Sequence, residues 1–416
     1  MSKIFGKYLE KNALFNNLIK EAPNTETKLI VIIPAYNEPD IINTLMSLKN
    51  CTKAKFPTEI LIVINQSEIT STEISRINKE TFTKVNNWTR NNATSILKFY
   101  VILIDNLPQK HAGAGLARKI AMDLAIERFQ SIDEENGIIA SLDADTLVSE
   151  NYLSEIQKAF LQNKKLNAAT FYFEHIPNDI LEINIAVETY ELYLRYFKQA
   201  LHYTGFPYAY HTIGSCFAVR ASAYAKQGGM NRRQGGEDFY FLHKVFPLDN
   251  CKELNHISVF PSSRPSDRVP FGTGPAIQKI INDGEYPTYR AEMFDHLKYL
   301  FDHKNELFQN NLEKLASFYS SLDQSIKHFI KQDEFADKLL EINANCASIE
   351  SFEKRFFQWF DAFKIIKYLN FTHKNSGRIS TQKAALGFLK DNLQIKPHTE
   401  KISDLLELYR SLEREN

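Results

Sequence analysis

The segment LIVIIPAYNE (29–38) opens the part of the sequence that decides the fold. It begins with apolar, mostly β-branched residues and ends in polar ones. Three later runs have the same apolar character: EILIVIN (59–65), FYVILID (99–105) and GIIASLDAD (137–145). Short, nearly continuous apolar runs are typical of strands that are buried on both faces. We therefore predict that each of these runs forms a buried β-strand.

Helical segments separate these predicted strands. In LARKIAMDLAIERF (116–129), the side chains of Leu116, Ile120 and Leu124 fall on one face at i, i+4 spacing. A shorter segment of the same kind is IINTLMSLKN (41–50). Strands that alternate with amphipathic helices predict an α/β fold with a Rossmann-like, mostly parallel sheet flanked by helices. Ligands of such sheets bind beyond the carboxyl ends of the strands, so functional residues are expected there.

The rest of the sequence has a different character. After about residue 165 we expect mixed strands and loops, with AATFYFEH (168–175) and SCFAVR (215–220) as strands. From Thr288 to Ser376 there is neither glycine nor proline, and apolar residues recur at helical spacing. We predict an N-terminal helix in 1–27, an α/β domain in 28–289 that divides after residue 150, and a C-terminal helical appendage in 290–416.

The bulk composition excludes several classes of protein. Fifty basic residues balance fifty acidic ones, so no net positive field attracts nucleic acid or an anionic membrane. The four cysteines show no C-x-x-C spacing, which argues against a zinc site and a disulfide framework. The N-terminal segment lacks the apolar core that a signal peptide needs, and no apolar run reaches the roughly 18 residues that a spanning helix needs. We therefore expect a cytoplasmic protein without a transmembrane segment or a nucleic-acid partner.

Asp143 and Asp145 follow the apolar run that ends at Leu142, so a strand delivers both carboxylates to one edge of the sheet. Two neighbouring carboxylates repel each other unless a cation lies between them. Oxygen ligands suit Mg²⁺ or Mn²⁺, which take one or two carboxylates and leave positions for phosphate oxygens. We interpret the pair as a metal site. Two solvated aspartates in a turn are the alternative.

Two further segments face the same predicted crevice. Asn37 and Glu38 follow Pro34, which is expected to end the first strand; a helix-capping turn is the alternative. Gly115 lies in a small-residue segment that leads into a helix carrying Arg118. A helix N-terminus and a guanidinium both attract phosphate, which favours a phosphate- or ribose-binding role. An ordinary glycine-rich loop is the alternative for this second segment.

Two later segments supply residues suited to group transfer. Glu237 and Asp238 open a predicted helix after two glycines, and a carboxylate here can accept the proton of an acceptor hydroxyl. The alternative is a pair of acids that interact only with the helix dipole. Arg264 and Arg268 lie in a polar loop rich in glycine and proline, and we expect them to close over a departing diphosphate. A solvated surface loop is the alternative.

These elements resemble, in their order and spacing, the family-2 glycosyltransferases of the GT-A fold. The resemblance covers roughly residues 28–275 and rests on four motifs. The family's Pro-x-Tyr-Asn-Glu signature matches Pro34-Ala35-Tyr36-Asn37-Glu38, and its small-residue segment ending in Ala-Arg matches Gly113 to Arg118. The D-x-D motif matches Asp143-Ala144-Asp145, and the Glu-Asp pair on the acceptor side matches Glu237-Asp238.

The resemblance implies a role for each motif. Asp145 would bind the metal ion that bridges the diphosphate, Asp143 would lie near the ribose, and Asp238 would be the general base of an inverting, single-displacement transfer. The segment from Pro34 to Glu38, which includes Tyr36, and the side chain of Arg118 would contact the nucleotide. Residues 28–150 would form the nucleotide-binding half of the domain and residues 151–289 the acceptor half.

One segment departs from the family pattern. The family commonly has an acidic Asp-Asp-Gly-Ser-like turn after the second strand, whereas this sequence has Asn65-Gln66-Ser67. An amide can still pair with uracil, so we predict that Asn65 and Gln66 contact the base and that the nucleotide is UDP.

The sequence therefore predicts an enzyme that moves a sugar from a nucleoside-diphosphate sugar to a hydroxyl acceptor (a glycan, a lipid-linked acceptor or a small molecule), with Mn²⁺ or Mg²⁺ as cofactor. A sugar-phosphate nucleotidyltransferase and a non-catalytic nucleotide- or partner-binding protein are the alternatives. Neither the sugar nor the acceptor follows from the sequence, and inversion is not settled against retention. The aromatic faces of 290–416, which include Phe356 and Trp359, are expected to pack on the α/β domain or on each other; a homodimer contact is the alternative.

Overall fold

The computed structural model describes residues 2–110, 112–266 and 272–415. The chain divides into two compact units. The sheet unit comprises Met1–Val187, His211–Gln278 and Glu413–Asn416, and the helical unit comprises Glu188–Tyr210 and Lys279–Leu412. Each unit is therefore assembled from segments that are not contiguous in the sequence.

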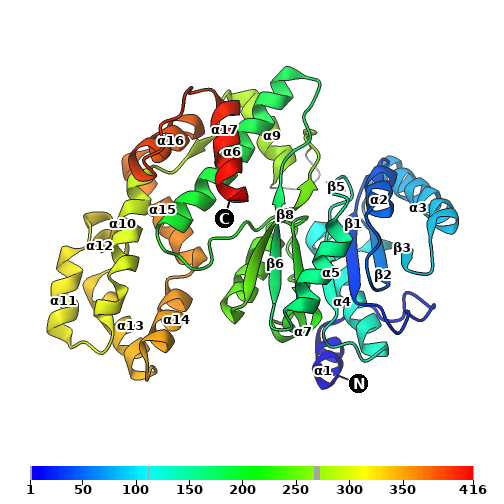
Figure 1. The fold of residues 1–416 in the computed structure, drawn as a ribbon, viewed down its shortest axis with the longest axis horizontal. Helices are drawn as coiled ribbons and strands as arrows, with labels where there is room; N and C mark the ends of the chain where they lie inside the picture. Colours follow the sequence, from blue (N-terminus) through cyan, green and yellow to red (C-terminus); the bar gives the residue numbers. More distant parts are fainter. Residues whose placement is uncertain (1, 111, 267–271, 416) are drawn as a thin grey trace. The chain divides into compact units, whose positions relative to one another are not determined.

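An eight-stranded sheet forms the centre of the sheet unit, with the strand order β3-β2-β1-β4-β7-β6-β8-β5 (Figure 1). β1, β2, β3 and β4 run parallel to one another, whereas β7 is antiparallel to both of its neighbours, β4 and β6. The strands are β1 (Leu29–Ala35), β2 (Thr58–Ser67), β3 (Leu97–Leu107), β4 (Ile138–Ser141), β5 (Leu147–Val148), β6 (Ala168–Phe173), β7 (Phe217–Arg220) and β8 (Cys251–Phe260). The four apolar runs quoted above correspond to β1–β4, and every residue of β1 and β4 is buried.

The helices of the sheet unit cover this sheet. They are α1 (Lys3–Asn12), α2 (Ile41–Lys49), α3 (Thr72–Asn92), α4 (Ala114–Ser131), α5 (Tyr152–Gln162), α7 (Ala221–Lys226), α8 (Glu237–Val245) and the 3₁₀ helix η1 (Phe246–Leu248). α3 packs on β2 and β3, whereas α4 packs on β1 and β2 and is itself covered by α1 and α7.

The order of the strands fixes where a ligand can bind. The chain moves outward from β1 to β2 and β3, and then returns through α4 to β4 on the other side of β1. Because crossovers between parallel strands are right-handed, this reversal places α4 on the face of the sheet opposite α2 and α3. A crevice opens at such a switch point, beyond the carboxyl ends of β1 and β4. Glu38 and Asp143 follow these two ends.

Two expectations about secondary structure were wrong. Pro34 does not end the first strand, because β1 continues to Ala35 and Pro34 is in register with Val63 of β2. Ile32 accepts a hydrogen bond from Leu142 on the β4 side, and β4 ends at Ser141, so a proline two residues further on loses no ladder bond.

The second wrong expectation concerns residues after 165, where we expected mixed strands and loops and did not predict a helix between 168–175 and 215–220. Residues 181–203 form the long helix α6 (Leu181–Tyr203). Its β-branched and aromatic residues favour strands locally. Leu192, Tyr196 and Ala200 nevertheless recur at helical spacing and are buried, so packing of this face determines the structure.

The helical unit is built around aromatic residues. Its elements are α10 (Ala291–Asp302), η2 (Lys304–Leu307), α11 (Leu312–Ser321), α12 (Gln324–Phe329), α13 (Gln332–Ala344), α14 (Ile349–Trp359), α15 (Ala362–Ser376), α16 (Thr381–Gly387), the π-helix η3 (Phe388–Asn392) and the short strands β9 (Pro287–Thr288) and β10 (Ile379–Ser380). Phe301, Phe356 and Phe360 are buried and their rings contact one another edge to face or stacked. The expected packing of the aromatic faces on each other is thus observed within this unit.

Three helices run from one unit into the other: α6, α9 (Thr273–Asp283) and α17 (Ile402–Arg414). We predicted domain boundaries at 27/28 and 289/290. In the structure the chain passes between the units after Val187, Tyr210, Gln278 and Leu412. The functional meaning of the predicted boundaries stays a prediction.

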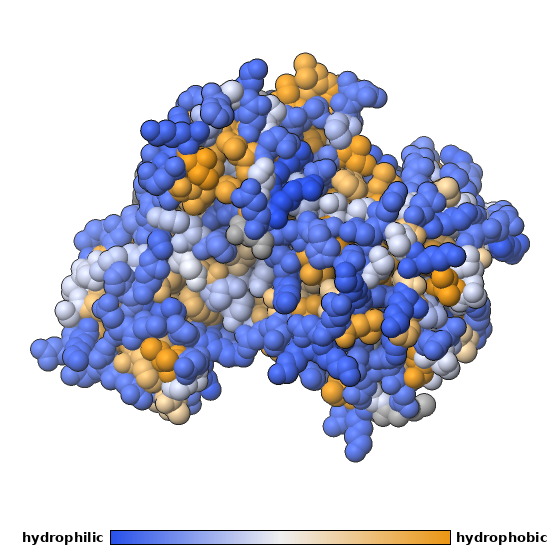
Figure 2. Space-filling view, viewed as in Figure 1, coloured by the Kyte–Doolittle hydropathy of each residue, from blue (hydrophilic) through white to orange (hydrophobic). Residues whose placement is uncertain are grey.

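The surface is mostly polar, with separate apolar patches (Figure 2). One patch lies at the beginning of α6, where Ile180, Leu181 and Ile185 are exposed. Within the described part of the chain, none of the helices is long and apolar enough to cross a membrane. The α/β fold with a mostly parallel sheet, flanking helices and C-terminal helices confirms the predicted fold class.

Candidate active site

Asp143 and Asp145 lie at the switch point, in the turn that follows β4. The main chain of this turn is held from two sides. The amide of Thr146 donates to the carbonyl of Asp143 (3.2 Å), and the hydroxyl of Thr44 on α2 donates to the carbonyl of Ala144 (2.8 Å). Both aspartate side chains remain accessible, at 37% exposed for Asp143 and 27% for Asp145. The turn is therefore fixed, while its carboxylates face the crevice.

Arg118 is buried under this turn and connects three elements. Its guanidinium donates to Ser141 Oγ at the end of β4 (2.6 Å) and to the Gly214 carbonyl before β7 (3.0 Å). It also donates to Asp143 Oδ1 (3.0 Å) and to Glu237 Oε1 at the start of α8 (3.1 Å). Asp143 and Glu237 raise the pKa of Arg118 above its ordinary value although burial opposes them, so the charge persists. One guanidinium thus joins the D-x-D turn to the Glu-Asp pair.

The small-residue segment before Arg118 has a steric function within the protein. A Cβ atom on Gly115 would lie 2.0 Å from the carbonyl oxygen of Arg233. Only glycine lets the first turn of α4 approach the loop that leads to α8 so closely. In the structure the backbone at Gly115 therefore approaches another segment of the chain itself. Contact of Gly115 with a nucleotide stays a prediction.

Glu237 and Asp238 differ in their surroundings although they are neighbours. Gly236 precedes them with φ +70°, a left-handed conformation that glycine adopts without strain. Glu237 is buried and bound to Arg118, whereas Asp238 is partly exposed and accepts a hydrogen bond from the amide of Phe239 (2.7 Å).

The pKa of Asp238 is raised to about 7, first by desolvation and then by the charge of Glu237; Arg118 opposes this shift. A carboxylate with a pKa close to neutrality has the basicity that a general base needs. Its Oδ2 would lie 3.3 Å from a Cβ atom on Gly214, the residue whose carbonyl binds Arg118. Asp238 is therefore next to the guanidinium that holds Asp143.

Arg264 brings together two acids from distant segments. Its Nη2 atom contacts Glu38 Oε2 and lies 3.2 Å from Asp145 Oδ2. Glu38 is buried, and the Arg264 side chain is 35% exposed. Because both contacts end on one nitrogen, the two carboxylates face the same point.

Glu38 and Asp145 are suited to a divalent metal ion. Among the described residues there is no group of three or more His, Cys, Asp or Glu side chains that could hold a metal by itself. Mg²⁺ and Mn²⁺ need few protein carboxylates when phosphate oxygens complete their coordination. The oxygens of Glu38 and Asp145 that meet at Arg264 Nη2 are hard donors of this kind, so the donor set fits such an ion.

A chain of amides connects the first motif to α3. The amide of Asn37, which has φ +52°, donates to Asn78 Oδ1 (2.9 Å), and Asn78 Nδ2 donates to Gln66 Oε1 (3.0 Å). Gln66 Nε2 in turn donates to Ser75 Oγ (3.1 Å). Both ends of the Gln66 amide are thus engaged inside the protein. Asn78 was not predicted from the sequence, because nothing in its local sequence distinguishes it from other helix residues.

Asn65 differs from Gln66 in having an acceptor available. Its Nδ2 donates to the Gly113 carbonyl (3.3 Å), while no described residue offers a hydrogen-bond donor to its buried Oδ1. Buried polar atoms are rarely left unsatisfied, so an unsatisfied oxygen at the end of β2 favours a ligand donor. Of the other predicted nucleotide-binding residues, Pro34 is buried within β1, Tyr36 is half-buried beyond its end, and Arg268 lies outside the described residues.

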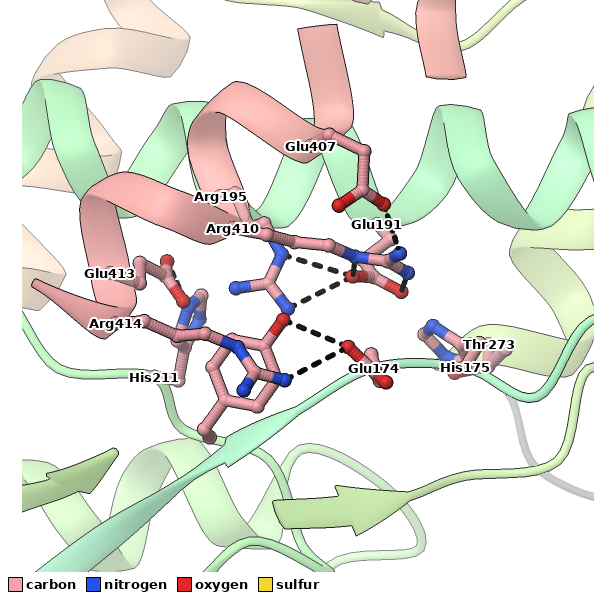
Figure 3. Close-up of polar contacts among 11 residues, drawn as sticks. Glu174, His175, Glu191, Arg195, His211, Thr273, Glu407, Arg410, Glu413 and Arg414 are labelled. Atoms are coloured by element: carbon pink, nitrogen blue, oxygen red, sulfur yellow. Dashed lines mark hydrogen bonds and ion pairs between the residues drawn. The ribbon is translucent and has the colours of Figure 1, made fainter. Parts of the chain in front are cut away.

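A second polar cluster follows the carboxyl end of β6, at the same edge of the sheet as Asp143, because β6 runs parallel to β4. Glu174 accepts hydrogen bonds from Tyr172 (3.0 Å) and Arg414 (3.3 Å), and His175 is hydrogen-bonded to Thr273 (3.1 Å) (Figure 3). Buried His211 pairs with Glu413 (2.8 Å). This cluster was not predicted from the sequence, because its members are up to 240 residues apart.

Comparison with known families gives an independent result. Residues 30–228 match the model of the family described as glycosyl transferase family 2. This segment contains the first three of the four motifs on which the predicted resemblance rests. The match supports the predicted glycosyltransferase over the nucleotidyltransferase and non-catalytic alternatives.

Solved structures of low sequence identity also match. S. aureus TarS 1–349 in complex with UDP-GlcNAc is 13% identical, with a TM-score of 0.39, and the match covers 94% of this chain and 93% of that one. A mannosyltransferase from Pyrobaculum calidifontis, PcManGT, in complex with GDP-Man and Mn²⁺ is 13% identical, with a TM-score of 0.36 and coverage of 99% and 92%. The chain spans 54% of the length of the longer TarS structure. A comparison with curated proteins finds no match.

Proposed function

We propose that this protein transfers a sugar from a nucleoside-diphosphate sugar to a hydroxyl group of an acceptor. Residues 30–228 of the chain belong to glycosyl transferase family 2, and the protein is accordingly a glycosyltransferase. UDP is our first choice of nucleotide, and Mn²⁺ or Mg²⁺ is the proposed cofactor. The observation that carries this proposal is the position of Arg118 between Asp143 and Glu237. Arg118 thus contacts both Asp143, the acid expected on the donor side, and Glu237, the acid expected on the acceptor side.

In the proposed reaction, Asp238 accepts the proton of the acceptor hydroxyl while the acceptor oxygen forms a bond to the anomeric carbon of the sugar. The bond between that carbon and the diphosphate oxygen breaks, and the nucleoside diphosphate leaves with the electron pair. Attack from the face opposite the leaving group inverts the anomeric centre. The raised pKa of Asp238 supports the role of base.

The remaining residues hold the reactants and balance charge. A divalent ion, when bound by Asp145 and Glu38, supplies positive charge opposite the leaving diphosphate. Arg118 holds Asp143 and Glu237 in place by donating one hydrogen bond to each. Two more hydrogen bonds, to Ser141 and the Gly214 carbonyl, fix the guanidinium itself. Asn65 offers its buried Oδ1 to a base N–H group. A base with an imide N–H, such as uracil, satisfies this acceptor.

A thermal-shift panel tests the donor and the metal together. We expect UDP or its sugars to raise the melting temperature in the presence of Mn²⁺ and to have little effect without it, because a ligand stabilises the state that binds it. Asp145→Asn should remove the metal-dependent shift. Glu155→Gln on α5, where Glu155 pairs with Lys158 and His256, is a control that should keep it.

Turnover is then measured with the nucleotide sugar that gives the largest shift. We expect slow release of the nucleoside diphosphate in the absence of an acceptor, and inverted stereochemistry in the glycoside product. If none of the nucleotides gives a metal-dependent shift, the proposed donor site is wrong. If release occurs equally well in the presence of a chelator, only the metal requirement is wrong.

A further inference from the structure

Arg264 lies where a cation would be needed. Its Nη2 atom contacts both Glu38 and Asp145, the two acids proposed to face the metal ion. The two carboxylates come from loops that follow different strands, and without a positive charge between them they would repel each other. A guanidinium cannot lose its proton in a protein, so this positive charge is permanent.

The main chain that carries Arg264 is anchored on both sides. The carbonyl of Pro261 accepts a hydrogen bond from Ile176 (3.3 Å), and Ser263 Oγ is bound by Asn178 (3.4 Å). On the other side, a Cβ atom on Gly274 would lie 2.7 Å from the Cβ atom of Ser266, so these two residues are packed against each other. The main chain near Arg264 is therefore fixed, and the long side chain is the part that can move.

We propose that Arg264 is an internal counterion that occupies the metal position and that a divalent ion must displace. In the metal-free protein the guanidinium neutralises Glu38 and Asp145. A divalent ion competes with it for Asp145, and the displaced guanidinium then reaches the diphosphate of the donor. This inference rests on the proposed function for its last step, whereas the competition for Asp145 rests on the contacts alone.

The exchange makes metal and donor binding cooperative. Metal binding without a nucleotide is weakened, because the guanidinium has to give up both carboxylates and gains no new partner. When a diphosphate is present, the displaced Arg264 forms charge-assisted hydrogen bonds to it. Each ligand therefore increases the affinity for the other by the same factor. Premature occupation of the site by metal alone is disfavoured.

Direct measurement of Mn²⁺ affinity tests the exchange without any reaction. Free Mn²⁺ is titrated with the full-length protein and detected by electron paramagnetic resonance, with no nucleotide present. We expect Arg264→Gln to bind Mn²⁺ about fivefold more tightly than the unmodified protein, the effect of removing one competing ion pair of about 1 kcal/mol. With saturating Mn²⁺, the same variant should bind UDP about tenfold more weakly, because the diphosphate loses its guanidinium.

Two further variants separate competition from a general loss of charge. Arg76→Gln removes an exposed arginine that pairs with Glu80 on α3, and we expect it to change neither affinity. Arg264→Lys keeps the charge but offers a single ammonium group. Its Mn²⁺ affinity should therefore lie between that of the unmodified protein and that of Arg264→Gln. Melting temperatures confirm that all variants are folded, as expected for a side chain that is partly exposed.

The outcomes distinguish this inference from the proposed function. If Arg264→Gln binds Mn²⁺ no more tightly than the unmodified protein, while UDP still binds with metal, the exchange is wrong and the donor site stands. An equal gain in Arg76→Gln also overturns it. If Mn²⁺ binds to none of these proteins, even with UDP present, the metal-dependent function and the exchange are both wrong.

Discussion

Asp238 differs from the other acids of the site in what surrounds it. Asp143 and Glu237 contact Arg118, and Glu38 and Asp145 contact Arg264, so each of these four carboxylates has a guanidinium within reach. At Asp238, burial and the charge of Glu237 outweigh the effect of Arg118 and raise the pKa to about 7. The four other acids are thus paired with arginines, whereas Asp238 is the carboxylate of the site whose pKa is raised.

The pH dependence of transfer follows from this pKa. We expect kcat/KM to rise with pH and to level off above about 7, because Asp238 has to be ionised to accept a proton. Asp238→Asn should lower kcat by a factor of about 10² to 10⁴, the usual contribution of a general base. A pH–rate profile with the activated nucleotide sugar measures both. An unchanged profile in Asp238→Asn would exclude this residue as the base.

The raised pKa of Asp238 also makes the stability of the folded protein depend on pH. Activity is expected to rise with pH, whereas stability is expected to fall. Asp238 ionises at about 3.8 when unfolded and at about 7 when folded, so the folded state is favoured below the first value and loses this advantage as pH rises towards the second. Asp238→Asn cannot ionise and should therefore become more stable relative to the unmodified protein between pH 4 and pH 7. Denaturant unfolding at several pH values tests this, and a difference that does not change with pH would contradict it.

At the level of secondary structure, the local sequence predicted those strands and helices that local interactions determine. The apolar runs identified β1–β4, and the i, i+4 spacing of Leu116 and Ile120 identified α4. The positions of the Pro-x-Tyr-Asn-Glu and D-x-D motifs after β1 and β4 also followed from the order of the elements. The charge pairs did not, because Arg118 and Glu237 are 119 residues apart and Arg264 and Glu38 are 226 residues apart. Their pairing depends on the packing of the loops, which no local pattern contains.

The start of α4 offers a test of this packing. Gly115→Ala should lower the free energy of unfolding by about 1–3 kcal/mol, because the new methyl group overlaps the carbonyl of Arg233. It should also lower kcat, since Arg233 lies in the loop that leads to Glu237. Gly6→Ala in α1 is the matched control: its methyl group would meet only the flexible end of Gln130, so the gain in helix propensity should leave stability unchanged or higher. Equal losses in the two variants would contradict the steric role of Gly115.

At the scale of the whole molecule, the helical unit has its own buried ion-pair network (Figure 3). Glu191 and Arg195 of α6 are fully buried, and Arg410 of α17 contacts Glu191 (2.8 Å). Glu407 also contacts Arg410 (2.6 Å), but its side chain is 66% exposed. The guanidinium of Arg410 is therefore bound by two carboxylates that differ greatly in exposure to solvent, Glu191 and Glu407.

This difference predicts unequal effects of two matched substitutions. Glu191→Gln should lower the free energy of unfolding of the helical unit by about 3–5 kcal/mol, because it leaves buried arginine charge without its counterion. Glu407→Gln should cost less than about 1 kcal/mol, the usual value of an exposed pair. Hydrogen exchange of α6 and α17 measures the local stability. Comparable losses of protection in the two variants would show that burial does not determine the energetics of this network.

The route of the chain through its two units has a practical consequence. Because the backbone passes between the units four times, and residues 413–416 return to the sheet unit, the helical unit is an insertion rather than an extension. Shortening the chain at residue 289 would therefore remove Glu413, the partner of His211, and leave residues 188–210 without the remainder of their unit. A protease that cuts once between 279 and 412 should produce two fragments that co-elute under native conditions. Separation of either unit requires a circularly permuted gene or two coexpressed polypeptides.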